Sequence, residues 1–198
     1  MDYYTNNAKA YVESTLHVDM QPLYQRFLPL QPERAHILDV GCGSGRDARY
    51  FIEHGYQVTA FDASAEITAL AEKEIGQPVQ VQRLQDIQYN NQFDGIWACA
   101  SLLHVPHSEL ESVFLRLHSA LKPGGVLYAS FKYGSGERER DGRRFTDMNE
   151  AGLDRLLNDV DGFSKVDVWT SEDRRPERAA EKWLNILLRA GEDAWRSA

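Results

Sequence analysis

The chain has 198 residues, of which 42% are hydrophobic and 26% charged, so it is long enough to bury the core of one globular domain. Its formal net charge of −8 argues against a broad surface that follows nucleic-acid phosphates, and we expect no nucleic-acid partner. No apolar run approaches the roughly 20 residues that a membrane-spanning helix needs, so we expect no membrane partner. The N-terminus lacks the basic and apolar segments of a signal peptide. Two cysteines without a CxxC spacing suit a reducing compartment, and we expect a cytoplasmic protein.

Helical and extended patterns alternate along the first two thirds of the chain. Residues 2–28 have apolar side chains at helical spacing. The patterns that follow predict, in order, a strand at 36–40, a helix at 45–54, a strand at 58–62, a helix between Ser64 and Gly76, and strands at 79–82 and 93–99. Ser108 and Glu111 predict the capping box of another helix, which is followed by a turn at 122–125 and a strand at 126–131. This alternation predicts a parallel sheet with helices on both faces.

The last third of the chain has a different pattern. Residues 134–145 are polar, charged and rich in glycine, which predicts a loop. Asp147 and Glu150 are placed to start a helix, and residues 163–170 are typical of a strand. The apolar spacing within residues 182–190 fits either a strand or a helix.

The segment from Ile37 to Asp47 combines a buried strand, a glycine-rich turn and the start of a helix. Three glycines at alternate positions, Gly41, Gly43 and Gly45, let the backbone approach a ligand closely. Such a turn before a helix favours groups that accept hydrogen bonds from backbone N–H. A dinucleotide fingerprint needs Gly or Ala where this chain has Arg46, which disfavours a nicotinamide-dependent dehydrogenase.

Further polar residues follow the other strands at the same predicted edge of the sheet, where open parallel sheets bind their ligands. Asp62 ends the second strand, and its two carboxylate oxygens suit the two hydroxyls of a ribose. Asp86 follows the third strand and is able to accept from an adenine amino group, with Ala63 and Ile87 as apolar walls for the ring. Ala98 lies at the end of the fourth strand. Together, these residues at the predicted edge of the sheet indicate an adenosine-like ligand.

Five segments in this order resemble those of the class I S-adenosylmethionine-dependent methyltransferases: residues 38–45, 61–62, 86–87, 93–96 and 121–125. The resemblance implies an α/β, Rossmann-like three-layer sandwich with a mostly parallel seven-stranded sheet and a C-terminal antiparallel strand pair. It therefore favours a strand for residues 182–190. We expect residues 1–198 to form a single methyltransferase domain, similar to the small bacterial tellurite- and thiol-methyltransferase-like enzymes, as a monomer or homodimer.

The resemblance also implies the cofactor, S-adenosylmethionine, with S-adenosylhomocysteine as product. It implies that residues 1–30 form a helical lid, with Tyr11 near the methionine end of the cofactor. The residue at position 46 is expected beside the methionine moiety, where Arg46 would pair with the carboxylate. The predicted cofactor-binding residues are Tyr11, Gly41, Cys42, Gly43, Arg46, Asp62, Ala63, Asp86, Ile87 and Ala98.

The implied reaction is an in-line displacement that moves a methyl group to a small-molecule acceptor. His104 is the candidate general base, because its ordinary pKa lies near neutrality. Residues 132–146 form the predicted substrate-side loop, and our hypothesis is that Tyr133, Arg143 and Arg144 bind an anionic acceptor. No Cys/His cluster has metal-ligand spacing, so no metal site is predicted. The alternatives are a tRNA methyltransferase and a non-catalytic protein that binds an adenosyl ligand.

Overall fold

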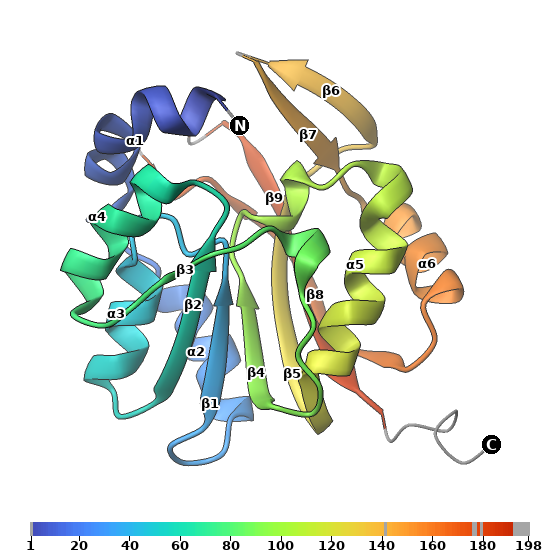
Figure 1. Ribbon diagram of the computed structural model, residues 1–198. Coiled ribbons are helices and arrows are strands. Elements are labelled where there is room, and N and C mark those ends of the chain that lie inside the picture. The colour runs from blue at the N-terminus through green and yellow to red at the C-terminus, as the bar shows by residue number, and fades with distance from the viewer. Residues whose placement is uncertain (1, 141, 176–177, 179, 192–198) are drawn as a thin grey trace.

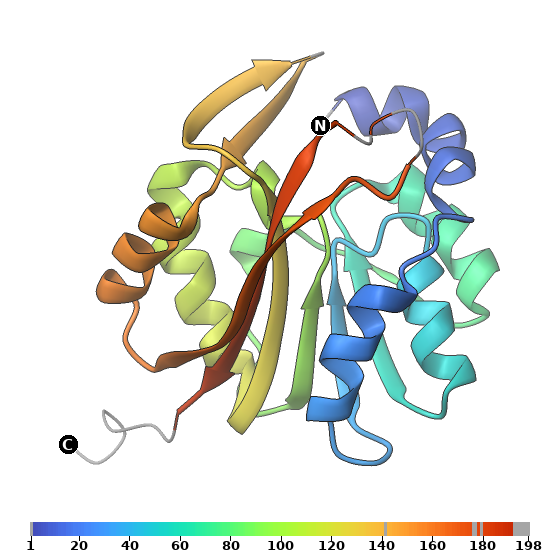
Figure 2. The ribbon, with the colours of Figure 1, turned by 180° about the vertical axis from the view of Figure 1, so that it is seen from behind.

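The computed structural model describes residues 2–140, 142–175, 178 and 180–191, with side chains from residue 7 onward. A seven-stranded sheet in the order β3-β2-β1-β4-β5-β9-β8 forms the central layer (Figure 1). Helices α5 and α6 cover one face, and α2 and α3 cover the other, which Figure 2 shows from behind. The predicted Rossmann-like three-layer sandwich is confirmed. The predicted single domain, residues 1–198, extends at both ends beyond the described residues.

The helices, in chain order, are α1 (Asp2–Thr15), α2 (Gln21–Phe27), η1 (Leu28–Leu30), α3 (Arg46–Glu53), α4 (Ala65–Ile75), η2 (Leu84–Asp86), η3 (Leu102–His104), α5 (His107–Ala120) and α6 (Glu150–Asp159). The strands are β1 (His36–Val40), β2 (Gln57–Asp62), β3 (Gln80–Val81), β4 (Phe93–Ala98), β5 (Leu121–Lys132), β6 (Gly136–Arg140), β7 (Arg143–Asp147), β8 (Phe163–Glu172) and β9 (Lys182–Ala190). Among the described helices, none is long and apolar enough to cross a membrane.

The sheet changes from parallel to antiparallel pairing at β5. The strands β1 to β5 pair in parallel, whereas β9 runs antiparallel to both β5 and β8. The ambiguous residues 182–190 are therefore a strand, as the resemblance implied. Their buried run from Leu184 to Leu188 reflects a strand covered on both faces, which is why its apolar residues do not alternate.

The predicted substrate-side loop, residues 132–146, is wrong in its secondary structure. Strands β6 and β7 form a two-stranded antiparallel sheet joined across residues 141 and 142. Every residue of β6 is exposed, so this strand carries no apolar residue that would reveal it in the sequence. Only the second strand buries side chains, at Phe145 and Thr146. The hairpin stands above the carboxyl ends of the central strands (Figures 1 and 2).

Two helix starts and one turn also differ from the predictions. Helix α5 begins after Pro106 without a side-chain cap, so Ser108 lies inside the helix. Helix α6 is capped by Asn149, whose side chain accepts from the N–H of Gly152. The turn at residues 122–125 is an irregular part of β5, where the pairing with β4 shifts register.

Candidate functional site

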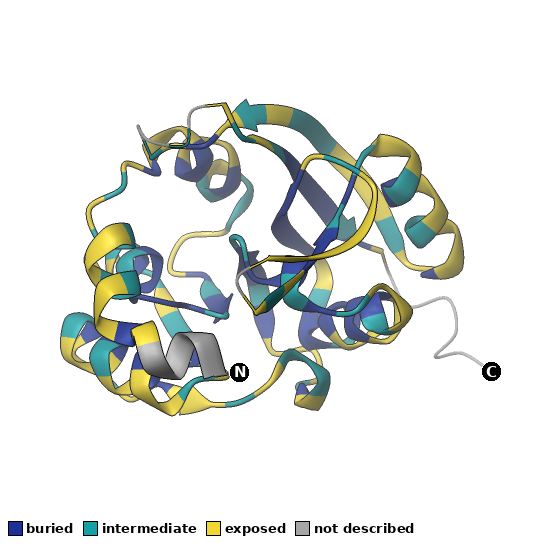
Figure 3. Cartoon of the chain, turned by 90° about the horizontal axis from the view of Figure 1, so that it is seen from above, coloured by how far each residue is buried: buried dark blue, intermediate teal, exposed yellow. Residues whose placement is uncertain are grey.

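Two adjoining cavities lie at the carboxyl edge of the sheet. The wide cavity has a volume of about 680 Å³, and the inner cavity of about 140 Å³. Viewed from above, the strands that end here are largely buried, whereas the helices around them are exposed on their outer sides (Figure 3). The residues that line both cavities are Tyr11, Gly41, Ala100, His104 and Arg143. These residues mark the junction of the two cavities.

The glycine-rich turn after β1 forms a wall of both cavities. Gly41, Gly43 and Gly45 all have positive φ, at +69°, +55° and +79°, which explains the glycine at each position. A β-carbon at Gly43 would lie 3.2 Å from the Tyr11 hydroxyl oxygen, so Tyr11 covers the turn directly. The turn and α1 are therefore in contact, and Tyr11 lines both cavities.

Asp62 joins the turns that follow β1 and β2. Its Oδ2 accepts from the N–H of Gly43 at 3.1 Å, and its Oδ1 accepts from the N–H of Ser64 at 3.0 Å. Burial raises the pKa of the Asp62 carboxyl above its ordinary value, although these hydrogen bonds to the carboxylate oppose the rise. Asp62 and Ala63 both line the wide cavity. An acceptor of hydrogen bonds thus lies on the wall of the wide cavity.

Arg46 does not present its planar fork to a ligand. Its Nε donates to Oδ1 of Asp47 at 2.6 Å and its Nη2 to Oδ2 at 2.9 Å. Its Nη1 donates to the carbonyl of Thr15 at 3.0 Å, which ties the end of α1 to the start of α3. The predicted pairing of this fork with a ligand carboxylate is therefore not present, because Asp47 occupies the fork. Arg46 still lines the inner cavity.

Asp47 is the centre of a buried polar network that the sequence analysis missed. It also accepts from the Tyr24 hydroxyl at 2.5 Å and from Nε1 of Trp97 at 2.8 Å. Burial opposes ionisation of Asp47, but the Arg46 charge and the hydrogen bonds outweigh it and hold its pKa below the ordinary value. Its partners are separated from it by 23 and 50 positions, so no local pattern points to the network.

Three predicted cofactor-binding residues lie outside the cavity walls. The Asp86 side chain is 62% exposed and faces Arg83 at 3.8 Å. Ile87 and Ala98 are fully buried in the apolar core. The wide cavity is lined instead by Gln85, which neighbours Asp86, and by Ala100, which follows Ala98 closely. The predicted residues that do line a cavity are Tyr11, Gly41, Cys42, Gly43, Arg46, Asp62 and Ala63.

His104 lies at the junction of the cavities, at the end of η3. Its Nδ1–H donates to the carbonyl of Arg144 at 2.8 Å, since a carbonyl only accepts, and the neutral ring therefore has its lone pair on Nε2. Burial lowers the pKa of His104 to about 4, and the Arg143 charge adds to this effect. The ring is thus neutral at pH 7 and is a weak base.

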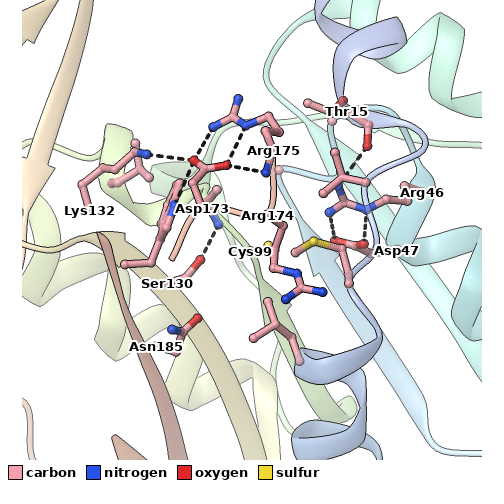
Figure 4. A pocket seen from close by; sticks show the side chains of 18 of the residues that line it. Thr15, Arg46, Asp47, Cys99, Ser130, Lys132, Asp173, Arg174, Arg175 and Asn185 are labelled. Carbon is pink, nitrogen blue, oxygen red and sulfur yellow. Dashed lines mark hydrogen bonds and ion pairs between the residues drawn. The ribbon is translucent and has the colours of Figure 1, made fainter. Parts of the chain in front are cut away.

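A charged cluster of Lys132, Asp173 and Arg175, together with Trp183, lines the inner cavity. Figure 4 shows the three charged side chains directed toward one another. The Lys132 and Asp173 side chains are only 9% and 4% exposed. Asp173 accepts from Lys132 at 3.2 Å, from Nη2 of Arg175 at 2.7 Å and from Nε1 of Trp183 at 3.1 Å. Nζ of Lys132 also lies 3.9 Å from the centre of the Trp183 ring. No pattern in the sequence indicates this cluster, because its members come from the end of β5, the segment after β8 and the start of β9.

The three predicted substrate residues have different positions. Arg143 lines both cavities, whereas Arg144 lines only the wide cavity. Tyr133 lies on neither wall, is exposed, and donates its hydroxyl to Glu150 at 2.9 Å. Of the three, Arg143 is therefore the residue best placed to meet a small ligand.

Comparison with known proteins identifies the central part of the chain. Residues 37–125 match the model of the methyltransferase domain family. This stretch is similar to methyltransferase domains. The prediction of a class I S-adenosylmethionine-dependent methyltransferase is confirmed. The matched stretch contains the glycine-rich turn and Asp62, whereas the hairpin and the charged cluster lie after it.

The chain is 33% identical over 108 residues to the ubiquinone biosynthesis O-methyltransferase of Xanthomonas axonopodis pv. citri. That match covers 51% of this chain and 44% of the relative, so the chain spans less than half of the relative's length. The relative's own substrate therefore does not transfer to this chain by similarity alone.

Solved structures share the fold over most of the chain. The Burkholderia thailandensis 1,6-didemethyltoxoflavin N1-methyltransferase, solved with its substrate and S-adenosylhomocysteine, has a TM-score of 0.78 at 24% identity and covers 96% of this chain and 85% of its own. The cyclase SpnF has a TM-score of 0.66 at 20% identity, with 86% and 80% covered. Both likenesses concern the fold, since one fold can carry different chemistries.

Proposed function

We propose that this chain transfers a methyl group from S-adenosylmethionine to a small-molecule acceptor. The observation that carries the proposal is the wide cavity, where the glycine-rich turn and the Asp62 carboxylate meet. The similar Burkholderia structure, a methyltransferase with bound S-adenosylhomocysteine and a small heterocyclic substrate, supports both the donor and the size class of the acceptor.

The residues of the wide cavity fit the donor. Asp62 offers carboxylate oxygens to a ribose, and Ala63 and Leu84 offer apolar surface to a base. Gly41 of the glycine-rich turn lines this cavity with backbone alone, without a β-carbon in the way. When bound, the donor supplies an electrophilic sulfonium methyl group. The residues at the junction, Tyr11 and His104 among them, then separate the reacting centre from bulk water.

The inner cavity suits a compact anionic acceptor. Its lining has six cationic side chains (Arg46, Lys132, Arg143, Arg174, Arg175 and Arg178) and three anionic ones (Asp47, Glu172 and Asp173). This local excess of positive charge contrasts with the net charge of −8 of the whole chain. We infer that an acceptor carrying a carboxylate or another oxyanion enters here, with Arg143 as its first contact at the junction.

His104 limits the acceptor chemistry. A neutral imidazole with a pKa of about 4 is able to take a proton only from a group that is itself readily ionised. Thiols, acids and metalloid oxyanions fit this requirement better than simple alcohols, because their nucleophilic form is accessible near neutral pH. The protein's remaining task is to align the acceptor behind the methyl group.

The test is to incubate the full chain with S-adenosylmethionine and separate panels of thiols, carboxylates, amines, metalloid oxyanions and unmodified tRNA, and to measure S-adenosylhomocysteine formation. We expect turnover with at least one small anionic acceptor and none with tRNA. Turnover with tRNA alone would reject the acceptor class. Binding of S-adenosylhomocysteine without turnover on any panel would favour a non-catalytic protein or a different reaction, as the cyclase SpnF illustrates for this fold.

A further inference from the structure

Ala100 has a strained backbone at the junction of the two cavities. Its φ of +54° lies in the left-handed region, where the β-carbon of alanine approaches the carbonyl oxygen unfavourably. The other described non-glycine residues with positive φ are Arg34 and Asn91, which precede β1 and β4 at the opposite edge of the sheet. Strain of this kind persists only where the surrounding structure holds it, and it concentrates at functional sites.

One buried side chain, Ser130 of β5, holds this backbone. The N–H of Ala100 donates to Oγ of Ser130 at 2.9 Å, and Ser130 is 2% exposed. Regular pairing of β4 with β5 ends just before, at Ala98 and Ala129. The Ser130 hydroxyl therefore accepts the hydrogen bond that a carbonyl of β5 would accept if the pairing continued, and the chain leaves the sheet at residue 100.

The turn at Ala100 sets the positions of two residues that line the cavities. Ser101 packs against the glycine-rich turn so closely that a β-carbon at Gly41 would lie 2.6 Å from Cβ of Ser101. The carbonyl of Ser101 then accepts from the N–H of His104 at 3.1 Å, which starts η3. The path from Ser130 through Ala100 thus fixes both the contact with Gly41 and the place of His104.

We propose that Ser130 is a positioning residue, which holds Ala100 in the left-handed turn and so shapes the donor-binding surface around Gly41, Ala100 and His104. The inference rests on the proposed function, since this surface belongs to the donor site. Ser130 also lines the inner cavity, so direct contact of its hydroxyl with a ligand is the competing role. A glycine at position 100 separates the two roles, because glycine adopts positive φ without help.

The test is a double-mutant cycle that measures the affinity for S-adenosylhomocysteine by calorimetry. Removing the hydroxyl by Ser130→Ala in the natural background should weaken binding about fivefold, the size of one neutral hydrogen bond. In the Ala100→Gly background the same removal should weaken binding less than twofold. Thermal unfolding without ligand gives a second readout, in which Ser130→Ala lowers the midpoint less when glycine occupies position 100.

Asn91→Gly is the matched control, because it relieves a similar φ of +49° at the far edge of the sheet. In this background Ser130→Ala should still weaken binding about fivefold, as one lost hydrogen bond does. An equal loss in the alanine and glycine backgrounds at position 100, or no loss in either, would overturn the inference. Absence of binding by the wild-type chain would instead reject the proposed function, so the two failures are distinguishable.

Discussion

The two halves of the sheet edge are built by different means. On the β1–β2 side, the cavity wall consists of backbone, glycines and one carboxylate, Asp62, whose partners are backbone N–H groups. On the β5–β9 side, the wall consists of long charged side chains that pair with one another, with Asp173 at their centre. The first half thus presents mainly backbone and one carboxylate to a ligand, whereas the second presents several charged side chains whose desolvation is costly.

This difference separates the part of the site that lies in the matched residues from the part that lies beyond them. The β1–β2 side lies within residues 37–125, which match the methyltransferase domain family, and its features are those that a shared donor would require. The cluster of Lys132, Asp173 and Arg175 lies beyond the matched residues, and buried ion pairs contribute little net stability. We infer that the cluster is maintained for recognition of the acceptor rather than for folding.

The largest effect that we predict is the loss of stability when the buried cluster is broken. Asp173→Ala leaves Lys132 and Arg175 without their shared carboxylate, although Glu181 still pairs with Lys132. The free energy of unfolding in urea should fall by about 2–3 kcal/mol, since an unpaired buried charge keeps its desolvation cost. Asp167→Ala removes a pair with Arg26 that is exposed on both sides, and it should cost less than about 0.5 kcal/mol. Equal costs for the two variants would contradict the difference between buried and surface pairs.

On the other half of the edge, Asp62→Ala should weaken binding of S-adenosylhomocysteine roughly ten- to hundredfold. The change removes acceptors for a ligand and for the N–H groups of Gly43 and Ser64, and hydrogen bonds to a charged group contribute about 1.5–3 kcal/mol each. Asp86→Ala, at the exposed position outside the cavity, should change the affinity less than about twofold, within the range of ordinary surface substitutions. A larger loss for Asp86 than for Asp62, measured by calorimetry, would restore the sequence-based assignment.

A third, smaller effect concerns His104 and pH. Its pKa is lowered from 6.5 to about 4, so the unfolded chain takes up a proton first as the pH falls. The wild type should therefore lose stability relative to His104→Gln between pH 6.5 and pH 4, by roughly 1–2 kcal/mol at pH 5. Urea denaturation of both proteins from pH 8 to pH 4.5 gives the difference. A constant difference across this range would show that burial does not depress the pKa of His104.

The smallest predicted effect compares two arginines of the hairpin once an acceptor is known. Arg143→Gln should raise the KM of an anionic acceptor roughly three- to tenfold with less change in kcat, since the charge acts mainly in binding. Arg144→Gln should raise this KM less, because Arg144 lines only the wide cavity. The initial-rate measurement is repeated at high salt, where the effect of an exposed charge diminishes. A larger effect of Arg144 would place the acceptor on the wide-cavity side.

The sequence predicts the β1–β2 side well because its signals are local. The glycines at positions 41, 43 and 45 need positive φ, and Asp62 ends an apolar strand, so neighbouring residues reveal both features. The same local pattern cannot distinguish which of two nearby residues faces a cavity, as Ala98 and Ala100 illustrate.

The β5–β9 side could not be predicted because tertiary contacts create it. Asp173 meets Lys132 across 41 positions, and no spacing in the sequence connects them. Strand β6 has only exposed residues and therefore lacks an apolar pattern.

The sequence analysis assigns Arg46 to a ligand because the sequence does not show that its neighbour Asp47 is buried beside Tyr24 and Trp97.

The most direct test of the account is a calorimetric titration of the purified chain with S-adenosylmethionine and S-adenosylhomocysteine, with Asp62→Ala in parallel. We expect saturable heat for both ligands with a 1:1 stoichiometry, and a clear loss of affinity in the variant. Absence of heat with either ligand at millimolar concentration, or unchanged affinity in Asp62→Ala, would contradict the assignment of the wide cavity to the methyl donor.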